Sequence, residues 1–397
     1  MSTFDRLQET ESSMIEFAQL LIRTRSFSGH EREVAGFVQA KMRQLAYDDV
    51  RIDEIGNVVG RIGAVGEPAI LLDAHMDTVE VNDGGAWTVP PFGAEIHGEN
   101  LYGRGAADMK SALAACVYAA AAAKGVLTES GRTAYVVCSV CEECCDGEGL
   151  RYLLTEGGVH PHNVVICEPS NNQIMLGHRG KMQACITSRG VSAHGATPQL
   201  GENAVYKMAE LVRRVEKRNA KLQKSGGGTL TLTNIRCTSA SPNAVPDSCT
   251  IRLDRRLVFG ETYQDAAAEM DSLVRGEQAS WSYDELQMKS WTGHEISYKP
   301  MHQPWRIATD HALTNLCVGA YQSVFCGKTP AFSYWDFSTN AVAPVSLGIP
   351  TIGFGPGDPA QAHTADEHCS INDIIDARRF YTALLESAFC DGGCNRG

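Results

Sequence analysis

Residues 71–80, LLDAHMDTVE, begin as a buried strand and then carry His75 and Asp77, two polar side chains that are costly to bury without partners. An extended chain points both side chains to the same face, because the residues are two positions apart. Groups of the same kinds follow other apolar segments, namely Asp108, Glu142 with Glu143, Glu168 and His363. The carboxyl ends of parallel strands meet at one cleft. We therefore expect these His and carboxylate groups to converge there.

The first 180 residues alternate between strand patterns and helix patterns. Residues 133–140 and 163–169 are near-continuous apolar runs, typical of strands covered on both faces. Residues 108–125 are rich in alanine and predict a helix that Gly125 ends. The same alternation returns after about residue 296. The sequence predicts an α/β catalytic domain, residues 1–180 and 296–397, with a mixed, mostly parallel sheet sandwiched by helices.

Residues 181–295 have a different pattern. A charged helix is predicted over 203–223, paired strands over 230–237 and 249–259, and a second helix over 262–276. About four strands and two helices in this order indicate a ferredoxin-like α+β domain, inserted into the larger domain as a lid.

Charge and hydropathy narrow the range of partners. Formal net charge is −12, which argues against nucleic acid and anionic membranes and favours a small-molecule substrate or a metal cation. No apolar run is long enough to cross a bilayer. The first residues lack a basic segment followed by an apolar one, which predicts a cytoplasmic location.

Four cysteines, Cys138, Cys141, Cys144 and Cys145, form two overlapping C-x-x-C spacings. Such thiols could bind zinc or an iron–sulfur cluster. However, no second pair lies at a conventional distance, so small buried hydrophobic side chains are the favoured interpretation.

Seven short segments carry a resemblance to a known family. They are HMDTV, GRGAADMK, CEECCDGEG, CEPS, GVSAHGATPQLGENA, PNAVPD and GFGPG with AHTADE. Their order resembles the dinuclear-zinc metallopeptidases that include aminoacylase, glutamate carboxypeptidase, acetylornithine deacetylase and succinyl-diaminopimelate desuccinylase. The resemblance covers essentially the whole chain and looks closest to the branch of selenium-metabolism-linked hydrolases.

The resemblance implies two divalent metal ions per subunit, Zn²⁺ first, with Co²⁺ or Mn²⁺ as alternatives. His75, Asp108 and Glu168 would bind one ion, and Asp108, Glu143 and His363 the other. A cis peptide bond is expected directly after Asp108, which could also serve as a helix N-cap. His368 is the competing choice for His363.

Two acids would act beside the metals. Asp77 would hydrogen-bond the second ring nitrogen of His75, although the pair could also be a core histidine with its ionic partner. Glu142 would be the general base that accepts a proton from a metal-bridging water. The alternative is that Glu142 and Glu143 are solvated loop acids.

The resemblance also assigns groups that contact substrate. His194 would donate to the developing oxyanion from the partner subunit, which implies a homodimer formed through the inserted domain. Asn243 would contact a substrate oxygen, and Arg256 would bind a substrate carboxylate unless it lies on an exposed charged edge strand. Gly355 would present its backbone amide to substrate unless its segment is a plain turn. Asn340 occupies a position where the family commonly has an aspartate.

These observations predict a metal-dependent amidohydrolase that cleaves an amide in a small carboxylate-bearing substrate, either an N-acyl amino acid or a dipeptide. One alternative is hydrolysis of another C–N bond, such as that of a carbamoyl compound in purine- or selenium-linked catabolism. The other is an inactive binding or regulatory homologue. The presence of Glu142 argues against that, because a pure binder has no use for a free base.

Overall fold

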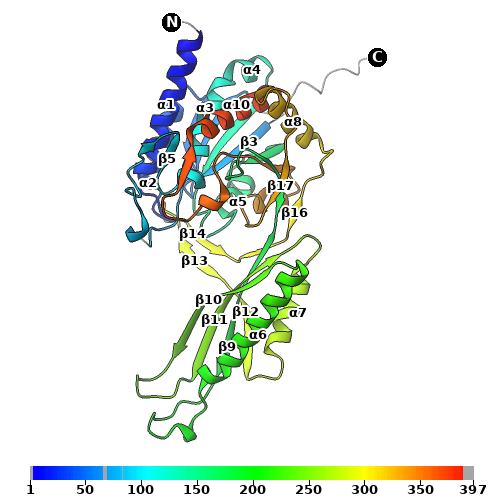
Figure 1. Cartoon of the computed structure of the whole chain (residues 1–397). Helices are drawn as coiled ribbons and strands as arrows, with labels where there is room; N and C mark the ends of the chain where they lie inside the picture. The colour runs from blue at the N-terminus through cyan, green and yellow to red at the C-terminus, as the bar shows by residue number, and fades with distance from the viewer. Residues whose placement is uncertain (1–2, 66–68, 83, 388–397) are drawn as a thin grey trace.

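The computed structural model describes residues 3–65, 69–82 and 84–387. A larger unit carries α1 and α10, and a smaller unit built on β9–β12 extends away from it (Figure 1). In the described part of the chain, no helix has the length and apolar character needed to cross a membrane.

A nine-stranded mixed sheet forms the centre of the larger unit. Its order is β1-β2-β6-β3-β7-β18-β8-β16, and β17 pairs with β8. The neighbours β6, β3, β7 and β18 run parallel. The strands are β1 (Asp49–Ile52), β2 (Val58–Gly63), β3 (Ala69–His75), β6 (Thr133–Ser139), β7 (Asn163–Ile166), β8 (Ile174–His178), β16 (Trp305–Arg306), β17 (Phe332–Trp335) and β18 (Thr351–Gly353).

Helices cover both faces of this sheet, so a central strand such as β3 is buried on both sides. Every residue of β3 is buried, with Ile70 and Leu72 in one hydrophobic core and Leu71 in another. The helices are α1 (Thr3–Arg23), α2 (Arg32–Gln44), α3 (Ser111–Ala122), α4 (Lys124–Glu129), α5 (Glu148–Thr155), α8 (Ala312–Val324), α9 (Val342–Ser346) and α10 (Ile371–Ser387). Side chains of α1, α2, α3 and α10 join the first core, and those of α5 and α9 join the second.

The Ala-rich helix begins later than its composition predicts. Asp108 and Met109 have non-helical backbone angles within a short turn, η2 (Ala106–Lys110), and the peptide bond between them is cis, as expected. Helix α3 therefore starts at Ser111, and Asp108 does not cap it. The prediction that Gly125 ends this helix was wrong, because α3 ends at Ala122 and Gly125 lies within α4.

The smaller unit has ferredoxin-like order, so the predicted fold class is confirmed. Its sheet runs β10-β11-β9-β12 with antiparallel neighbours, β15 also pairs with β9, and α6 and α7 lie on one face (Figure 1). Its elements are β9 (Gly180–Arg189), α6 (Ala204–Ser225), β10 (Thr229–Thr238), β11 (Ser248–Leu257), α7 (Tyr263–Val274), β12 (Ala279–Tyr283) and β15 (Met301–His302). The domain boundaries at 181 and 295 stay a prediction.

Short elements complete the described chain. The hairpin β13 (Leu286–Lys289) and β14 (Glu295–Tyr298) follows the smaller sheet but buries Ile296 and Tyr298 in the core of the larger unit. The other short elements are β4 (Ile96–His97), β5 (Asn100–Tyr102), β19 (His368–Ser370), η1 (Gly84–Ala86), η3 (Pro198–Leu200) and η4 (Pro359–Gln361).

The four clustered cysteines are free thiols. Cys138, Cys141 and Cys145 are buried, and Cys144 is exposed. Burial raises the pKa of the Cys138 thiol, so it stays protonated. Among the described residues, the groups of side chains arranged to hold a metal ion contain no cysteine. The three buried cysteines belong to the hydrophobic core of the larger unit, which fits their interpretation as small hydrophobic side chains.

A buried ion pair within the smaller unit gives a stability prediction. The Arg255 side chain is 2% exposed, and its Nε donates to Glu269 Oε2 at 2.9 Å. Replacing Arg255 with Met would leave the buried carboxylate of Glu269 with Arg218 alone. We expect Arg255→Met to lower the free energy of unfolding by about 3–5 kcal/mol, measured by urea titration with Trp281 fluorescence reporting on this unit.

Lys289→Met is the matched control, since Lys289 pairs with Glu295 on an exposed surface. It should change the free energy of unfolding by less than about 1 kcal/mol. Equal losses in the two variants would contradict the importance assigned to burial.

Candidate metal centre

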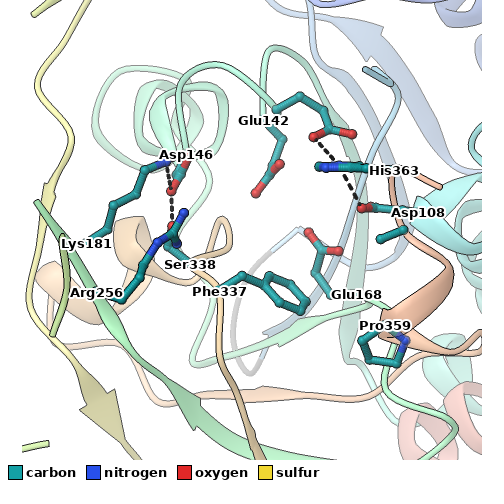
Figure 2. Close-up of a pocket in the computed structure, with 12 residues that line it drawn as sticks. Asp108, Glu142, Asp146, Glu168, Lys181, Arg256, Phe337, Ser338, Pro359 and His363 are labelled. Carbon is teal, nitrogen blue, oxygen red and sulfur yellow. Dashed lines mark hydrogen bonds and ion pairs between the residues drawn. The ribbon is translucent and has the colours of Figure 1, made fainter. Parts of the chain in front are cut away.

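A cavity of about 350 Å³ opens between the sheet of the larger unit and the start of β9 (Figure 2). The carboxylates of Asp108, Glu142 and Glu168 lie on one side of it, and Lys181 and Arg256 lie on the other together with Asp146, the ionic partner of Lys181. The lining residues are Asp108, Glu142, Glu143, Asp146, Glu168, Lys181, Arg256, Phe337, Ser338, Pro359, Ala362 and His363. The cavity therefore has an acidic end and a cationic end.

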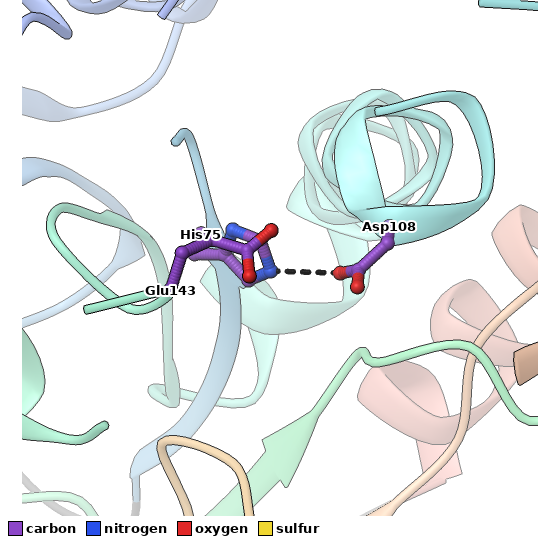
Figure 3. Close-up of side chains that lie close together, drawn as sticks. All are labelled: His75, Asp108 and Glu143. Carbon is purple, nitrogen blue, oxygen red and sulfur yellow. Dashed lines mark hydrogen bonds and ion pairs between the residues drawn. The ribbon is translucent and has the colours of Figure 1, made fainter. Parts of the chain in front are cut away.

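His75 lies at the end of β3 and faces two of the carboxylates. Its Nε2 is 3.0 Å from Asp108 Oδ1 (Figure 3) and 3.6 Å from Glu168 Oε1. All three side chains are almost entirely buried. A core histidine with a single ionic partner would not need two further carboxylates, so the arrangement is that of a ligand cluster.

His363 faces the second pair of carboxylates. Its Nε2 is 3.4 Å from Asp108 Oδ2 and 2.9 Å from Glu143 Oε2. Each oxygen of Asp108 thus points at a different imidazole. The structure brings together all five residues predicted to bind metal. His368 instead stacks on Tyr102, with ring centroids 4.8 Å apart.

Asp77 lies beside His75 and also contacts the loop that carries Glu142 and Glu143. His75 Nδ1 lies 3.0 Å from the backbone oxygen of Asp77, whereas the nearer carboxylate oxygen is 3.5 Å away. The Asp77 carboxylate accepts hydrogen bonds from the backbone amides of Glu142 and Glu143, each at 3.1 Å, and from Ser28 Oγ at 2.7 Å. The side chain of Asp77 therefore holds the loop that carries the two glutamates while it faces His75, and its role toward the imidazole stays a prediction.

Glu367 is a functional residue that the sequence interpretation missed. Its Oε1 accepts hydrogen bonds from the backbone amides of Ala107 and Asp108, at 3.0 and 3.1 Å, and Arg104 forms an ion pair with it. The carboxylate is fully buried. Glu367 thereby positions Asp108. Its place as the last residue of the AHTADE segment was the available signal.

Asp146, Lys181 and Ser338 were also missed. Lys181 Nζ donates to both oxygens of Asp146, at 3.0 and 3.1 Å, and Ser338 Oγ donates to the same carboxylate (Figure 2). Burial alone would raise the pKa of Asp146, but Lys181, His302 and Ser338 outweigh it and lower that pKa. Asp146 lies within the CEECCDGEG segment, while Lys181 had no such signal.

Of the groups assigned to substrate, the structure brings Arg256 to the cavity. Arg256 Nε donates to Asp254 Oδ1 at 2.7 Å, and the buried Arg255 points to the opposite face of β11. His194 and Asn243 are exposed and do not line this cavity. A β-bridge joins His194 to Ala244 in the loop between β10 and β11, at the end of β9 opposite to Lys181.

Gly355 has a different contact from the predicted one. Its amide donates to Ser170 Oγ at 2.9 Å, so it does not face the cavity. A Cβ at this position would lie 2.3 Å from the backbone oxygen of Cys167 and 2.4 Å from that of Glu168. Glycine here permits close packing against the segment that holds Glu168.

The carboxylates strongly perturb both imidazoles. Burial alone would lower the pKa of His75, but Asp108, Asp77 and nearby glutamates raise it well above its ordinary value. Hydrogen bonds to Asp108 and Glu143 raise the pKa of His363 to about 10. Burial raises the pKa of Glu168. In the metal-free protein, the two imidazoles therefore hold protons, and this positive charge compensates part of the negative charge of the carboxylates.

The donor set fits divalent metal ions. Asp108, Glu142, Glu143 and Glu168 place four carboxylates around two imidazoles, an excess of negative charge in a buried site. Glu143 Oε1 is buried and has no hydrogen-bond partner in the described part of the chain. Mixed imidazole and carboxylate ligands suit zinc and similar ions.

Comparison with known proteins places this geometry in context. Residues 71–387 match peptidase family M20/M25/M40. Protein YgeY of Escherichia coli K12 is 34% identical over 96% of this chain and 95% of that protein. A succinyl-diaminopimelate desuccinylase of Rhodospirillum centenum is 27% identical over 94% and 97%. The crystal structure of the M20 family metallo-carboxypeptidase Sso-CP2 from Sulfolobus solfataricus matches with a TM-score of 0.73 and 18% identity, covering 96% of this chain and 99% of that one.

The raised pKa values of His75 and His363 predict proton release on metal binding. Both imidazoles are protonated at pH 7 in the metal-free protein, and only the neutral form can ligate a cation. We therefore expect the two imidazoles to release about two protons on metal loading at pH 7. The apparent affinity should rise with pH as the imidazoles lose their protons, and the contribution of His363 should level off at about pH 10, its pKa. Calorimetry in buffers of different ionisation enthalpy measures the release.

His363→Ala should remove about one of these protons, and His368→Ala serves as the control that should remove none. A metal titration without proton release at pH 7 would show that the imidazoles do not take part.

Proposed function

The chain belongs to peptidase family M20/M25/M40, a family of metal-dependent hydrolases, and we propose that it is a two-metal amidohydrolase. Its substrate would be a small molecule with a free carboxylate, such as an N-acyl amino acid or a dipeptide. The observation that carries this proposal is the two-ended cavity, with ligand-type side chains at one end and Arg256 at the other. A relative named as a desuccinylase and a structural neighbour named as a metallo-carboxypeptidase agree with amide hydrolysis.

Five residues would hold two divalent ions, with zinc as the first candidate and cobalt or manganese as alternatives. His75, Asp108 and Glu168 would form one site, and Asp108, Glu143 and His363 the other. When bound, the ions would polarise the scissile carbonyl and lower the pKa of the attacking water.

Glu142 would carry the proton. Its carboxylate lines the cavity and is largely buried, and its backbone is fixed by the bond to Asp77. Glu142 also lies close enough to His75 and Glu168 to bind a cation together with them. Glu143, however, contacts His363, so we propose that Glu143 is the metal ligand of this loop and that Glu142 stays free. The free Glu142 carboxylate would take a proton from water and return it to the leaving nitrogen.

The inserted unit would supply the remaining groups to a partner subunit. The segments that carry His194 and Asn243 lie side by side, since the Gly195 amide donates to the backbone oxygen of Asn243 at 2.6 Å. They are at the end of the smaller sheet away from their own cavity. Large apolar side chains are exposed on the same unit, namely Val191, Leu200, Tyr206 and Ile235. A homodimer formed through this unit would cover them and place His194 at the partner's oxyanion.

A cytoplasmic location is part of the proposal. The described cysteines are free thiols, and several are buried. Free thiols of this number are typical of a reducing compartment.

The role of Glu142 predicts a separation of metal binding from turnover. Glu142→Ala should retain two metal ions per subunit, because the five ligands are untouched. Its kcat should fall by about 10²–10⁴-fold, the usual contribution of a general base. Elemental analysis and a panel of N-acetyl amino acids and dipeptides, assayed with and without chelator, measure both quantities. Glu156→Ala, at an exposed position after α5, is the control. Full activity in Glu142→Ala would exclude this residue as the base.

Mixing two inactive variants tests the contribution of the partner subunit. Glu142→Ala lacks the base, and His194→Ala lacks the oxyanion donor. In a hybrid dimer one site would regain both groups, so random mixing should restore about a quarter of wild-type activity. Activity is measured after subunit exchange, with each variant mixed with itself as the control. No recovery in dimers shown to have exchanged would mean that His194 does not act across the interface.

A further inference from the structure

The cationic end of the cavity contains two positive groups, and we infer that Lys181 is a second residue that recognises the substrate carboxylate, together with Arg256. This inference rests on the proposed function and deepens it. A single arginine would place one positive charge beside the carboxylate. A pair of cations from neighbouring strands would bind the carboxylate between two donors and make its charge a requirement.

Backbone register places the two cations side by side. Lys181 on β9 is the direct cross-strand partner of Arg256 on β11. Both side chains line the cavity and are mostly buried, at 11% and 25% exposure (Figure 2). Like charges directly opposite each other on a sheet repel and are destabilising. Two cations can occupy these facing positions only when anions lie between or beside them.

The chain supplies one carboxylate to each cation but leaves donors free. Arg256 uses Nε and Nη2 on Asp254, and among the described residues no partner is recorded for Nη1. Lys181 uses Nζ on the two oxygens of Asp146, and an ammonium group has a third N–H. Lys181 therefore keeps one N–H for a ligand and Arg256 keeps three, so each cation can donate to one oxygen of a carboxylate.

Lys181 is also held rigidly. The Lys181 ammonium group is held by Asp146, in the loop after β6, and that carboxylate is held in turn by Ser338, which follows β17. A donor that is already positioned loses little entropy when a ligand binds. The same contacts would suit a purely structural bridge between the two units, and the experiment must separate these roles.

Binding to the metal-loaded, full-length Glu142→Ala protein provides the test, because this background prevents turnover. Calorimetry compares N-acetyl-L-alanine with N-acetyl-L-alaninamide, which lacks the negative charge. Adding Lys181→Met should weaken binding of the acid by about tenfold or more, equivalent to about 1.4 kcal/mol. It should change binding of the amide by less than about twofold. Lys181→Arg should retain most of the preference for the acid, and Lys289→Met, on the exposed hairpin, should leave it unchanged.

Each outcome decides the inference. Equal weakening of acid and amide, or no weakening of either, would overturn it and leave Lys181 as a structural bridge. Thermal unfolding of each variant is measured alongside, and Lys181→Arg keeps the test valid if Lys181→Met fails to fold. If the unmodified, metal-loaded chain hydrolyses no member of the panel of N-acetyl amino acids and dipeptides, but the acid is still preferred through Lys181, the proposed function fails while the inference holds.

Discussion

Negative charge buried in one cavity is the constraint on which the rest of the structure depends. Asp108, Glu142, Glu143 and Glu168 lie together, and in the described part of the chain His75 and His363 are the imidazoles that contact them. Carboxylates out of water are stable only when cations or donors compensate them. In the metal-free protein the imidazoles do so by holding protons. Two divalent ions would compensate the charge more fully, and in the proposed arrangement both would share Asp108 as a ligand.

Two other carboxylates make this arrangement possible without entering it. Asp77 binds the backbone amides of Glu142 and Glu143, and Glu367 binds that of Asp108. Each therefore fixes the main chain of a ligand-bearing segment. Because these amides are held at separate points, the side chains can face one another despite their mutual repulsion. The rigidity of the site comes from main-chain contacts.

The sequence predicted the parts of this site that local pattern determines. Strand parity and the apolar run of β3 placed His75 at the end of a buried parallel strand, and the resemblance supplied its partners. It did not predict that the carboxylate of Asp77 also accepts hydrogen bonds from the amides of Glu142 and Glu143, because that contact depends on how the loop folds back. Nor did it predict the pair of Asp146 and Lys181, which are 35 residues apart and meet only through tertiary structure. Nor did it predict the late start of α3, because the non-helical backbone angles of Asp108 and Met109 are not visible in helix propensity.

The dimensions of the smaller sheet explain why two copies of the chain would be needed for one complete site. Strand β9 has 10 residues, which at about 3.3 Å per residue separate its ends by about 30 Å. Lys181 at one end lines the cavity, whereas the bridge to Ala244 holds His194 near the other end. No movement of one rigid sheet can bring both ends to the same cavity. For His194 to reach a substrate, it must reach that of another subunit, so each inserted unit would serve its own site with one end and its partner's with the other.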